Sequence, residues 1–344
     1  MSARPLRHLL PALGCIMLAA CCAAPALAQT KVGTSMGQFL LIEPSARFAG
    51  MGNTGVTARG EVLAAYFNAA AIGSLDRYSA QFTHARWFAD ISYDHVAVAM
   101  PLGGSKGNVA LSLTSLNSGD IDVRTVNAPL GTGERYRVSD VSFALGYGRY
   151  ITPLFSLGLQ AHYVQETIWN SSARTMVMSA GTLYRLGERG LEIGSSLNFF
   201  GTGARFGGRD LAIRFDADPD VHGDNSTLPA EQSTGQFPVP VLFRVGLGLP
   251  LRPAIGHDIR LAIDAFHPSD NTESLSLGGE WSYRDLLALR AGYQNLFMSD
   301  SELGFTAGAG FRTRVGDTRL QADYAWAAHR HLEGTHRVTI GVSN

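Results

Sequence analysis

From about residue 78 to its C-terminus, the chain alternates apolar and polar or small residues with a period of two. Such a period places every second side chain on the same face of a β-strand. In one clear segment the apolar face consists of Phe155, Leu157, Leu159, Ala161 and Tyr163. The same part of the chain contains no run of about 20 apolar residues, the length that a membrane-spanning helix needs. Repeated strands with one apolar and one wet face are typical of a transmembrane β-barrel.

The number of these segments and the lengths of their connections define the predicted architecture. We count about fourteen strands, and bacterial barrels require an even number. The connections alternate between tight turns and longer polar loops. The two longest loops, at about 118–138 and 201–238, both alternate with tight turns in the same order and so fall at the same end of the predicted barrel. Aromatic residues near the predicted strand ends suit an interfacial girdle; they are Trp87, Phe88, Tyr150, Trp169, Phe199, Phe200, Trp281 and Tyr283.

These patterns predict an all-β fold, a transmembrane antiparallel β-barrel of about fourteen strands that occupies residues 78–344. Since short turns of such barrels face the periplasm and long loops face outward, we expect both termini in the periplasm. The expected location is the outer membrane of a Gram-negative-type bacterium, with its lipids as partners. A soluble β-sandwich is the alternative, but an outward face this rich in Leu, Phe and Val would aggregate.

The first 28 residues have the features of an export signal. Arg4 and Arg7 precede an apolar stretch, and Ala26-Leu27-Ala28 is a small-x-small cleavage site. We therefore expect the mature chain to begin at Gln29. A lipobox ending at Cys21 is a second interpretation, less well placed relative to the apolar stretch. All three cysteines lie within this signal, so a mature chain would hold no thiol for a disulfide, a zinc site or nucleophilic catalysis.

Charge composition excludes one class of partner. The whole chain has 28 Lys and Arg and 29 Asp and Glu, and removal of the signal with its two arginines leaves a net charge of −3. A chain that is close to neutral carries no electrostatic footprint for nucleic acid. We expect no nucleic-acid partner.

Residues 29–77 do not alternate. They include the Gly-rich piece Gly50-Met51-Gly52 and a helix-compatible piece at 61–67. A barrel of this strand number has room for a plug, and glycine lets backbone approach a wall closely. We expect this segment to fold into the lumen as a plug or hatch.

The chain resembles a known family in several ordered pieces. Residues 37–40, 45–53 with Arg47, Gly50, Met51 and Gly52, and 64–70 with Asn68 look like the N-terminus of PorV/PorQ-family proteins within the FadL-like barrels. Later pieces at 85–94, 264–271, 285–293 and 334–337 are also similar. The family usually has Asn-Pro-Ala in the hatch, whereas here Asn68 is followed by Ala69, which loosens the bend that a proline would fix. The last residue, Asn344, also replaces the terminal aromatic of many barrels.

The resemblance implies two functions. PorV-like members resemble accessory barrels of the type IX secretion system, so the leading hypothesis is a role in protein export. Exported proteins or secretion-system subunits would then bind the loops at 118–138 and 201–238. The alternative, implied by FadL-like relatives, is a channel for a hydrophobic small molecule. It predicts an apolar pocket beside the hatch, with Phe39, Leu40, Leu41, Ile42 and Phe48 in its lining.

Charged residues occur on the predicted luminal face in both signs. An ion-selective pore favours a ring of one sign, whereas mixed signs favour a salt-bridged wall that holds a plug. A constricted polar path is the other interpretation. The candidate ionic network consists of Arg244, Arg260, Asp264, Glu280, Arg290, Arg312, Arg319, Asp323 and Arg337, with Glu192 beside it.

Catalytic and metal-binding signals are weak. Many serines are present, but no histidine has a partner that spacing identifies, so we expect no enzymatic activity and no catalytic residues. His329, His331, Glu333 and His336 cluster in the last outer loop and could bind a divalent metal, although histidines in exposed loops are usually only solvated. We therefore predict no metal site and no cofactor.

Overall fold

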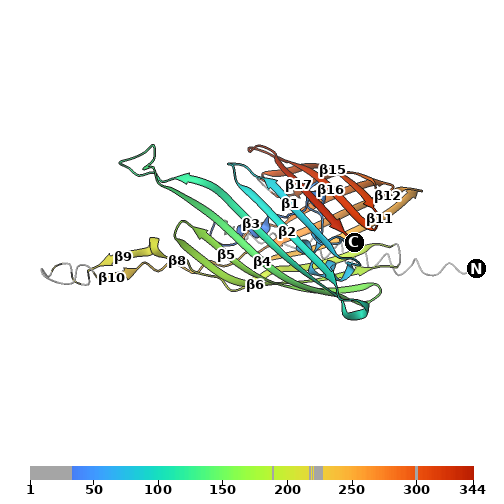
Figure 1. The fold of residues 1–344 in the computed structure, drawn as a ribbon, viewed down its shortest axis with the longest axis horizontal. Coiled ribbons are helices and arrows are strands. Elements are labelled where there is room, and N and C mark those ends of the chain that lie inside the picture. Colours follow the sequence, from blue (N-terminus) through green and yellow to red (C-terminus); the bar gives the residue numbers. More distant parts are fainter. Residues whose placement is uncertain (1–32, 188–189, 217, 219, 221–227, 299–300) are drawn as a thin grey trace, which may run out of the picture.

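The fold is a closed antiparallel β-barrel (Figure 1). The computed structural model describes residues 33–187, 190–216, 218, 220, 228–298 and 301–344. Within them, fourteen strands form the wall: β1 (Ser79–Arg86), β2 (Ser92–Pro101), β3 (Asn108–Asp122), β4 (Arg135–Thr152), β5 (Phe155–Ile168), β6 (Ser171–Arg185), β7 (Glu192–Gly201), β11 (Leu242–Ala254), β12 (His257–Pro268), β13 (Ser274–Tyr283), β14 (Leu287–Leu296), β15 (Leu303–Val315), β16 (Thr318–His329) and β17 (Thr335–Ser343).

Each wall strand pairs with its neighbours in sequence, and β1 pairs with β17 to close the barrel, with Ser79 opposite Ser343. Closure leaves no unpaired edge, which a strand in lipid requires. The predicted strand number and barrel class are thus confirmed. No helix among the described residues is long and apolar enough to cross a membrane.

The alternation predicted from sequence is the alternation between the outer surface and the lumen. On β4, Phe143 and Leu145 are about half exposed, at 48% and 54%, while Ser142 and Ala144 between them are buried. Outward apolar side chains on a closed wall meet lipid, and inward polar or small ones meet the barrel contents. The wall therefore has the two-faced character of a transmembrane barrel.

One predicted aromatic position is wrong. Phe199 on β7 was expected in an interfacial girdle, but its side chain is 1% exposed and packs against Tyr66 and His162 inside the barrel. A bulge between β6 and β7 is the cause, because the register shifts there and Phe199 takes a left-handed φ of 62°. A bulge turns side chains that follow it to a different face.

The long connections lie at one end of the barrel, which we call the loop end, and the tight turns and the C-terminus lie at the other, the turn end (Figure 1). The loop predicted at 118–138 is shorter than expected. Cross-strand ion pairs, Asp120 with Arg137 and Asp122 with Arg135, extend the β3–β4 hairpin. The connection from β7 to β11 contains β8 (Gly207–Gly208), η4 (Arg209–Leu211), β9 (Ala212–Phe215) and β10 (Leu228–Glu231).

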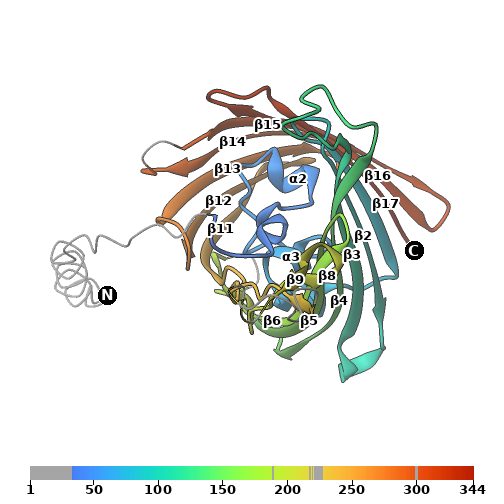
Figure 2. The same cartoon turned by 90° about the vertical axis from the view of Figure 1, so that its left-hand side faces the viewer.

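Residues 33–77 lie inside the barrel, as Figure 2 shows in a view from the loop end. We call this segment the hatch. It contains η1 (Gln38–Leu41), α2 (Ala46–Ala49), α3 (Ala64–Phe67) and η2 (Ala69–Ser74). Its described part begins near the loop end, where Ser35 Oγ donates to Asp270 Oδ2 over 2.9 Å. The expected signal and the predicted mature terminus Gln29 lie outside the described residues.

Candidate functional site

Inward-facing glycines of the wall accommodate the hatch backbone. A Cβ atom at Gly278 of β13 would collide with the Met51 carbonyl, and one at Gly158 of β5 would collide with the Ala69 carbonyl. Cβ atoms at these positions would keep the hatch away from the wall, because interiors are packed without spare volume. Glycines at luminal positions therefore let hatch backbone and barrel backbone lie in direct contact.

The Gly50-Met51-Gly52 piece follows the short helix α2 and turns against β13–β15. Ser45 caps α2 by accepting the Phe48 amide over 3.4 Å, as expected of a serine before a helix. Gly52 has a φ of 67° and donates its amide to Thr306 Oγ1 over 2.9 Å. Because a left-handed φ beside a wall backbone suits only glycine, Gly52 sets the direction in which the chain leaves α2.

Asn68 links two parts of the hatch to the wall. Its Nδ2 donates to the Val56 and Thr182 carbonyls, each over 2.9 Å, and its Oδ1 accepts the Ala70 amide over 3.0 Å. The residue is completely buried and caps the start of η2. Every hydrogen bond here involves backbone, so Asn68 fixes the position of η2 against β6.

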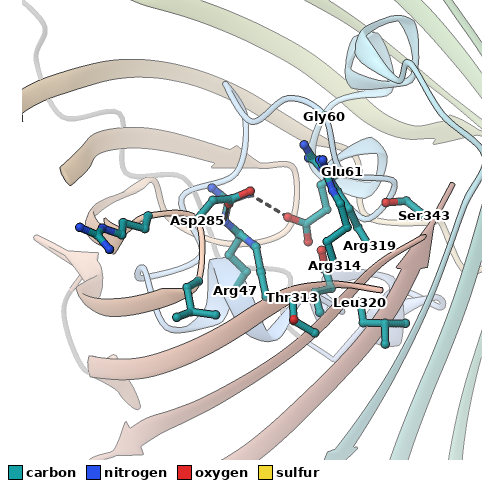
Figure 3. Close-up of a pocket in the computed structure, with 13 residues that line it drawn as sticks. Arg47, Gly60, Glu61, Asp285, Thr313, Arg314, Arg319, Leu320 and Ser343 are labelled. Atoms are coloured by element: carbon teal, nitrogen blue, oxygen red, sulfur yellow. Dashed lines mark hydrogen bonds and ion pairs between the residues drawn. The ribbon is translucent and has the colours of Figure 1, made fainter. Parts of the chain in front are cut away.

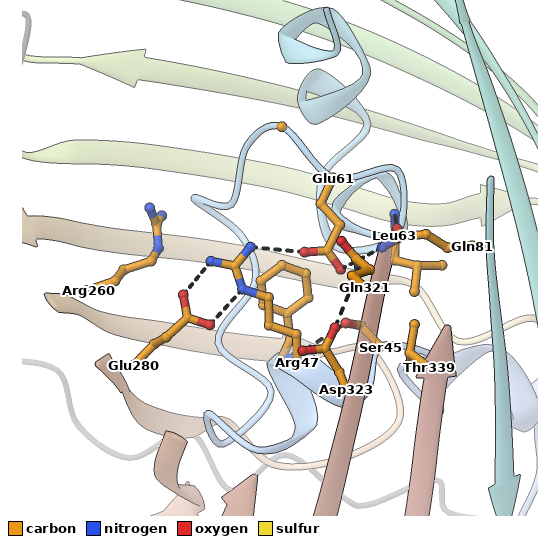
Figure 4. A network of polar contacts seen from close by, with 12 residues as sticks. Ser45, Arg47, Glu61, Leu63, Gln81, Arg260, Glu280, Gln321, Asp323 and Thr339 are labelled. Atoms are coloured by element: carbon orange, nitrogen blue, oxygen red, sulfur yellow. Dashed lines mark hydrogen bonds and ion pairs between the residues drawn. The ribbon is translucent and has the colours of Figure 1, made fainter. Parts of the chain in front are cut away.

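A buried chain of charges joins the hatch to β13, β14 and β16 (Figure 4). Arg47 pairs with Glu280 through Nη2 to Oε1 over 2.6 Å and with Glu61 over 2.9 Å. Arg290 connects Glu280 to Asp323: its Nε lies 2.6 Å from Glu280 Oε2, and its Nη1 lies 2.7 Å from Asp323 Oδ1. The two carboxylates of the wall thus alternate with two arginines. Each buried charge has a neighbouring charge of the opposite sign, as a buried ion needs.

A second group lies beside this chain. Arg260 donates to Glu192 Oε2 over 2.8 Å and to the Thr57 carbonyl over 2.7 Å, and Arg59 approaches Glu192 Oε1 over 3.1 Å. Asp264, also inward-facing, accepts two hatch amides, those of residues 55 and 56, over 2.8 and 2.9 Å. A carboxylate that receives backbone N–H groups fixes the peptide plane as well as the side chain.

Arg244 forms a separate contact. Its guanidinium lies 5.4 and 5.5 Å from the ring centroids of Phe67 and Phe266 and pairs with Glu43 over 3.1 Å. Burial raises the pKa of the Glu43 carboxyl, and the charge of Arg244 acts in the opposite direction. Arg337 likewise lies over an aromatic ring, that of Trp87, at 5.9 Å.

Two predicted network residues lie elsewhere. Arg312 pairs with Asp285 over 3.2 Å at the turn end, and Arg319 has no ion-pair partner among the described residues. The structure therefore brings together Glu280, Arg290 and Asp323 of the predicted set, and places the others in separate contacts with the hatch or at the turn end. Four charged residues with ion-pair partners were not predicted from sequence: Glu43, Arg59, Glu61 and Asp285. Their only signal was charge inside the hatch or in a turn.

An apolar cluster packs around the hatch in the lumen, and most of its wall members lie toward the loop end. Hatch residues Phe39, Leu40 and Phe48 are at most 3% exposed and pack with inward-facing wall residues and with the β7–β11 connection. The wall and connection members are Val164, Ala173, Val177, Leu183, Phe199, Ala204 and Val239, with Leu116, Phe206 and Phe237 packed against them. Barrel interiors are ordinarily polar. An apolar region of this extent is therefore the most distinctive feature of this lumen.

The last loop holds no metal-like constellation within the described chain. His331 pairs with Glu302 over 2.6 Å, His336 contacts the Tyr324 hydroxyl over 2.7 Å, and His329 contacts Thr335. Hydrogen bonding to His331 holds the pKa of the Glu302 carboxyl below its usual value. Each of these histidines therefore contacts a different partner, and the three do not converge on one point.

Fold and site together define a class of protein: a fourteen-stranded transmembrane β-barrel plugged by its own N-terminal segment. No known family profile matches the chain, and no curated protein matches it significantly. Solved structures do. The Pseudomonas putida toluene transporter TodX superposes with a TM-score of 0.55 at 14% identity over 88% of this chain and 98% of that one.

Two further structures are similar to the same degree. They are the CymD monoaromatic hydrocarbon channel (TM-score 0.54, 11% identity, 88% of this chain and 97% of that one) and the Ralstonia pickettii toluene transporter TbuX (0.52, 10%, 88% and 98%). At such identities the likeness establishes the fold. The predicted barrel fold is therefore confirmed, whereas the PorV/PorQ part of the resemblance gains no support from these structures.

Proposed function

We propose that the protein is an outer-membrane channel for a hydrophobic small molecule, with its long loops outside and its turns in the periplasm. The observation that carries this proposal is the apolar cluster around the hatch. Its members come from the hatch, the wall and the β7–β11 connection, so it joins the outer surface to the plug. The proposal involves no catalysis and no cofactor.

Similar folds add support for this choice. The structures that superpose on the chain are described as toluene transporters or a monoaromatic hydrocarbon channel. An apolar ligand binds where polar groups are few and surface is concave or buried. Phe39, Leu40 and Phe48, three of the five residues expected to line such a pocket, are buried in the cluster, and Leu41 packs against it.

The hatch residues must shift before a ligand can enter. Phe39 and Leu40 are 3% and 0% exposed, so the cluster is packed shut. The segment before them is held mainly by polar contacts: Ser35 and Gln38 donate to Asp270, and the Gly37 amide donates to Glu166. The Met36 amide donates to the Pro238 carbonyl over 3.0 Å, and the Met36 side chain is buried in the cluster. Such polar contacts exchange readily for water. Residues 33–38, in which Met36 is the one buried apolar side chain, are therefore the part of the hatch best suited to move.

Uptake in cells tests the proposal. Gram-negative cells that lack their own hydrocarbon channels would express the full chain, and entry of labelled toluene would be followed. We expect faster uptake than in cells with an empty vector, and loss of this gain in Phe39→Asp. The control is Leu130→Asp, at a side chain 94% exposed in the β3–β4 loop. Uptake no faster than the empty vector, with folded barrel present in the outer membrane, would contradict the proposal.

The second candidate is the export role in a type IX-like secretion system. The observation that favours it is the β9–β10 hairpin, which extends from the loop end and exposes Ile213, Phe215 and Leu228 by 43–52% (Figure 1). Exported proteins or secretion subunits would bind there. Co-purification of such proteins with the native chain, lost when the hairpin is deleted, would favour this role over the channel.

A further inference from the structure

Two cavities open at the turn end of the lumen, on the side of the hatch that faces the turns. One of about 500 Å³ lies between the β13–β14 turn, β15 and β16, and one of about 730 Å³ lies between β7, β11 and β12. Arg47 of the hatch and Arg312 of β15 line both cavities. Together they form a vestibule beneath the plug, on the opposite side of the hatch from most wall members of the apolar cluster.

The first cavity carries an excess of positive charge (Figure 3). Its lining includes Arg47, Arg284, Arg312, Arg314 and Arg319, but only two carboxylates, Glu61 and Asp285. Both carboxylates are already engaged, Glu61 by Arg47 and Asp285 by Arg312. Three guanidinium groups therefore remain without a carboxylate among the described residues.

Two of these three are held directly opposite each other. In the β15–β16 register Arg314 faces Arg319, and Figure 3 shows their side chains next to one another. Like charges directly opposite on paired strands are destabilising. Neither side chain has a hydrogen bond or an ion pair within the described part of the chain, so no internal contact explains the arrangement.

We propose that the Arg314–Arg319 pair is a binding site for a phosphate-class oxyanion. A guanidinium presents parallel N–H groups that match two oxygens of a phosphate, and two guanidinium groups on adjacent strands suit a group with more than one negative charge. Arg284 at the neighbouring turn adds positive potential, while its guanidinium lies 5.1 Å from the Tyr283 ring centroid. The site does not depend on passage of a hydrophobic molecule, and it stands if the channel proposal fails.

The phosphate could be free or could belong to a larger amphiphile. The cavity is open to the turn end and borders two exposed leucines, Leu286 in the β13–β14 turn and Leu320 on the outward face of β16. An alkyl chain would therefore find apolar surface at the rim of the barrel, next to the guanidinium groups. Inorganic phosphate and hexyl phosphate are the two probes that separate these sources. Both present the same head group, and only the second has an apolar tail.

Binding of the two probes to the full chain in non-ionic detergent tests the proposal by calorimetry. We expect saturable binding that weakens as salt is raised, and an increase of about tenfold or more in the dissociation constant for the double variant Arg314→Gln, Arg319→Gln. The double variant Arg314→Lys, Arg319→Lys should have a dissociation constant between those of the parent and the double Gln variant, because lysine keeps the charge but lacks the paired N–H groups. If hexyl phosphate binds more tightly than inorganic phosphate, the natural ligand is an amphiphile. If the two probes bind equally, the natural ligand is the free anion.

A matched control is Arg135→Gln, which removes an exposed arginine at the loop end that pairs with Asp122. We expect it to leave both affinities unchanged. The Gln variants should fold as well as the parent, since they remove mutual repulsion; migration of the folded barrel on gels before and after heating checks this. The proposal is overturned if neither probe binds at millimolar concentration, or if the double Gln variant binds as the parent does.

Discussion

Arg47 of the hatch and Glu280 of β13 form a two-point ion pair, with Nε to Oε2 at 2.9 Å and Nη2 to Oε1 at 2.6 Å. Glu280 also accepts Arg290 Nε over 2.6 Å, so one carboxylate serves two arginines. Two parallel contacts define an orientation as well as a distance. The pair therefore fixes how α2 is seated against the wall.

Replacement of Glu280 by Gln should destabilise the protein strongly. It leaves Arg47 and Arg290 in a buried site with one carboxylate fewer, and breaking a buried pair from one side costs about 3–5 kcal/mol. The free energy of unfolding would be measured in urea with the protein in detergent micelles. The control Asp122→Asn breaks an exposed pair and should cost less than about 1 kcal/mol. Equal losses in the two variants would show that the Glu280 contacts are not what holds the hatch.

The neighbouring glycines Gly278 and Gly279 should respond differently to a methyl group. Gly278→Ala directs Cβ at the Met51 carbonyl and should destabilise the protein by about 1–3 kcal/mol, a typical cost of overpacking. Gly279→Ala directs Cβ to the other face, where its nearest neighbour is the Leu261 side chain at 3.6 Å. Urea unfolding of both variants makes the comparison. A harmless Gly278→Ala would mean that the hatch backbone is not in contact with β13.

Ala69→Pro should be tolerated or slightly stabilising. Ala69 is the first residue of η2, Asn68 before it is extended (φ −153°, ψ 113°), and no acceptor for the Ala69 amide lies among the described residues. Proline suits the first helical position, and an extended residue is what should precede it. The expected gain in unfolding free energy is about 0.4–1 kcal/mol, because proline restricts the unfolded chain. A clear loss of stability would show that the wall at Gly181 leaves no room for the ring.

Strand positions could be predicted from sequence because each wall strand has one face in lipid and one in the lumen, and that difference repeats every two residues. Contacts of the hatch could not. Arg47 and Glu280 are 233 residues apart, and no local spacing links them. Glu280, Arg290 and Asp323 could be predicted because all three lie at inward-facing positions of alternating strands, whereas Glu61 has no such pattern around it. Phe199 was placed on the wrong side because a bulge changes the period without changing the residue types.

The most direct test of the channel account immobilises the start of the hatch. Ser35→Cys and Asp270→Cys replace two side chains in contact at the loop end, where the Ser35 hydroxyl donates to the Asp270 carboxylate over 2.9 Å. A short cleavable thiol cross-linker would join them in cells that take up labelled toluene. The account predicts that uptake is lost on cross-linking, returns on cleavage and is unaffected by the reagent in either single variant. Undiminished uptake through the fully cross-linked protein would contradict passage of the hydrophobic molecule past a movable hatch.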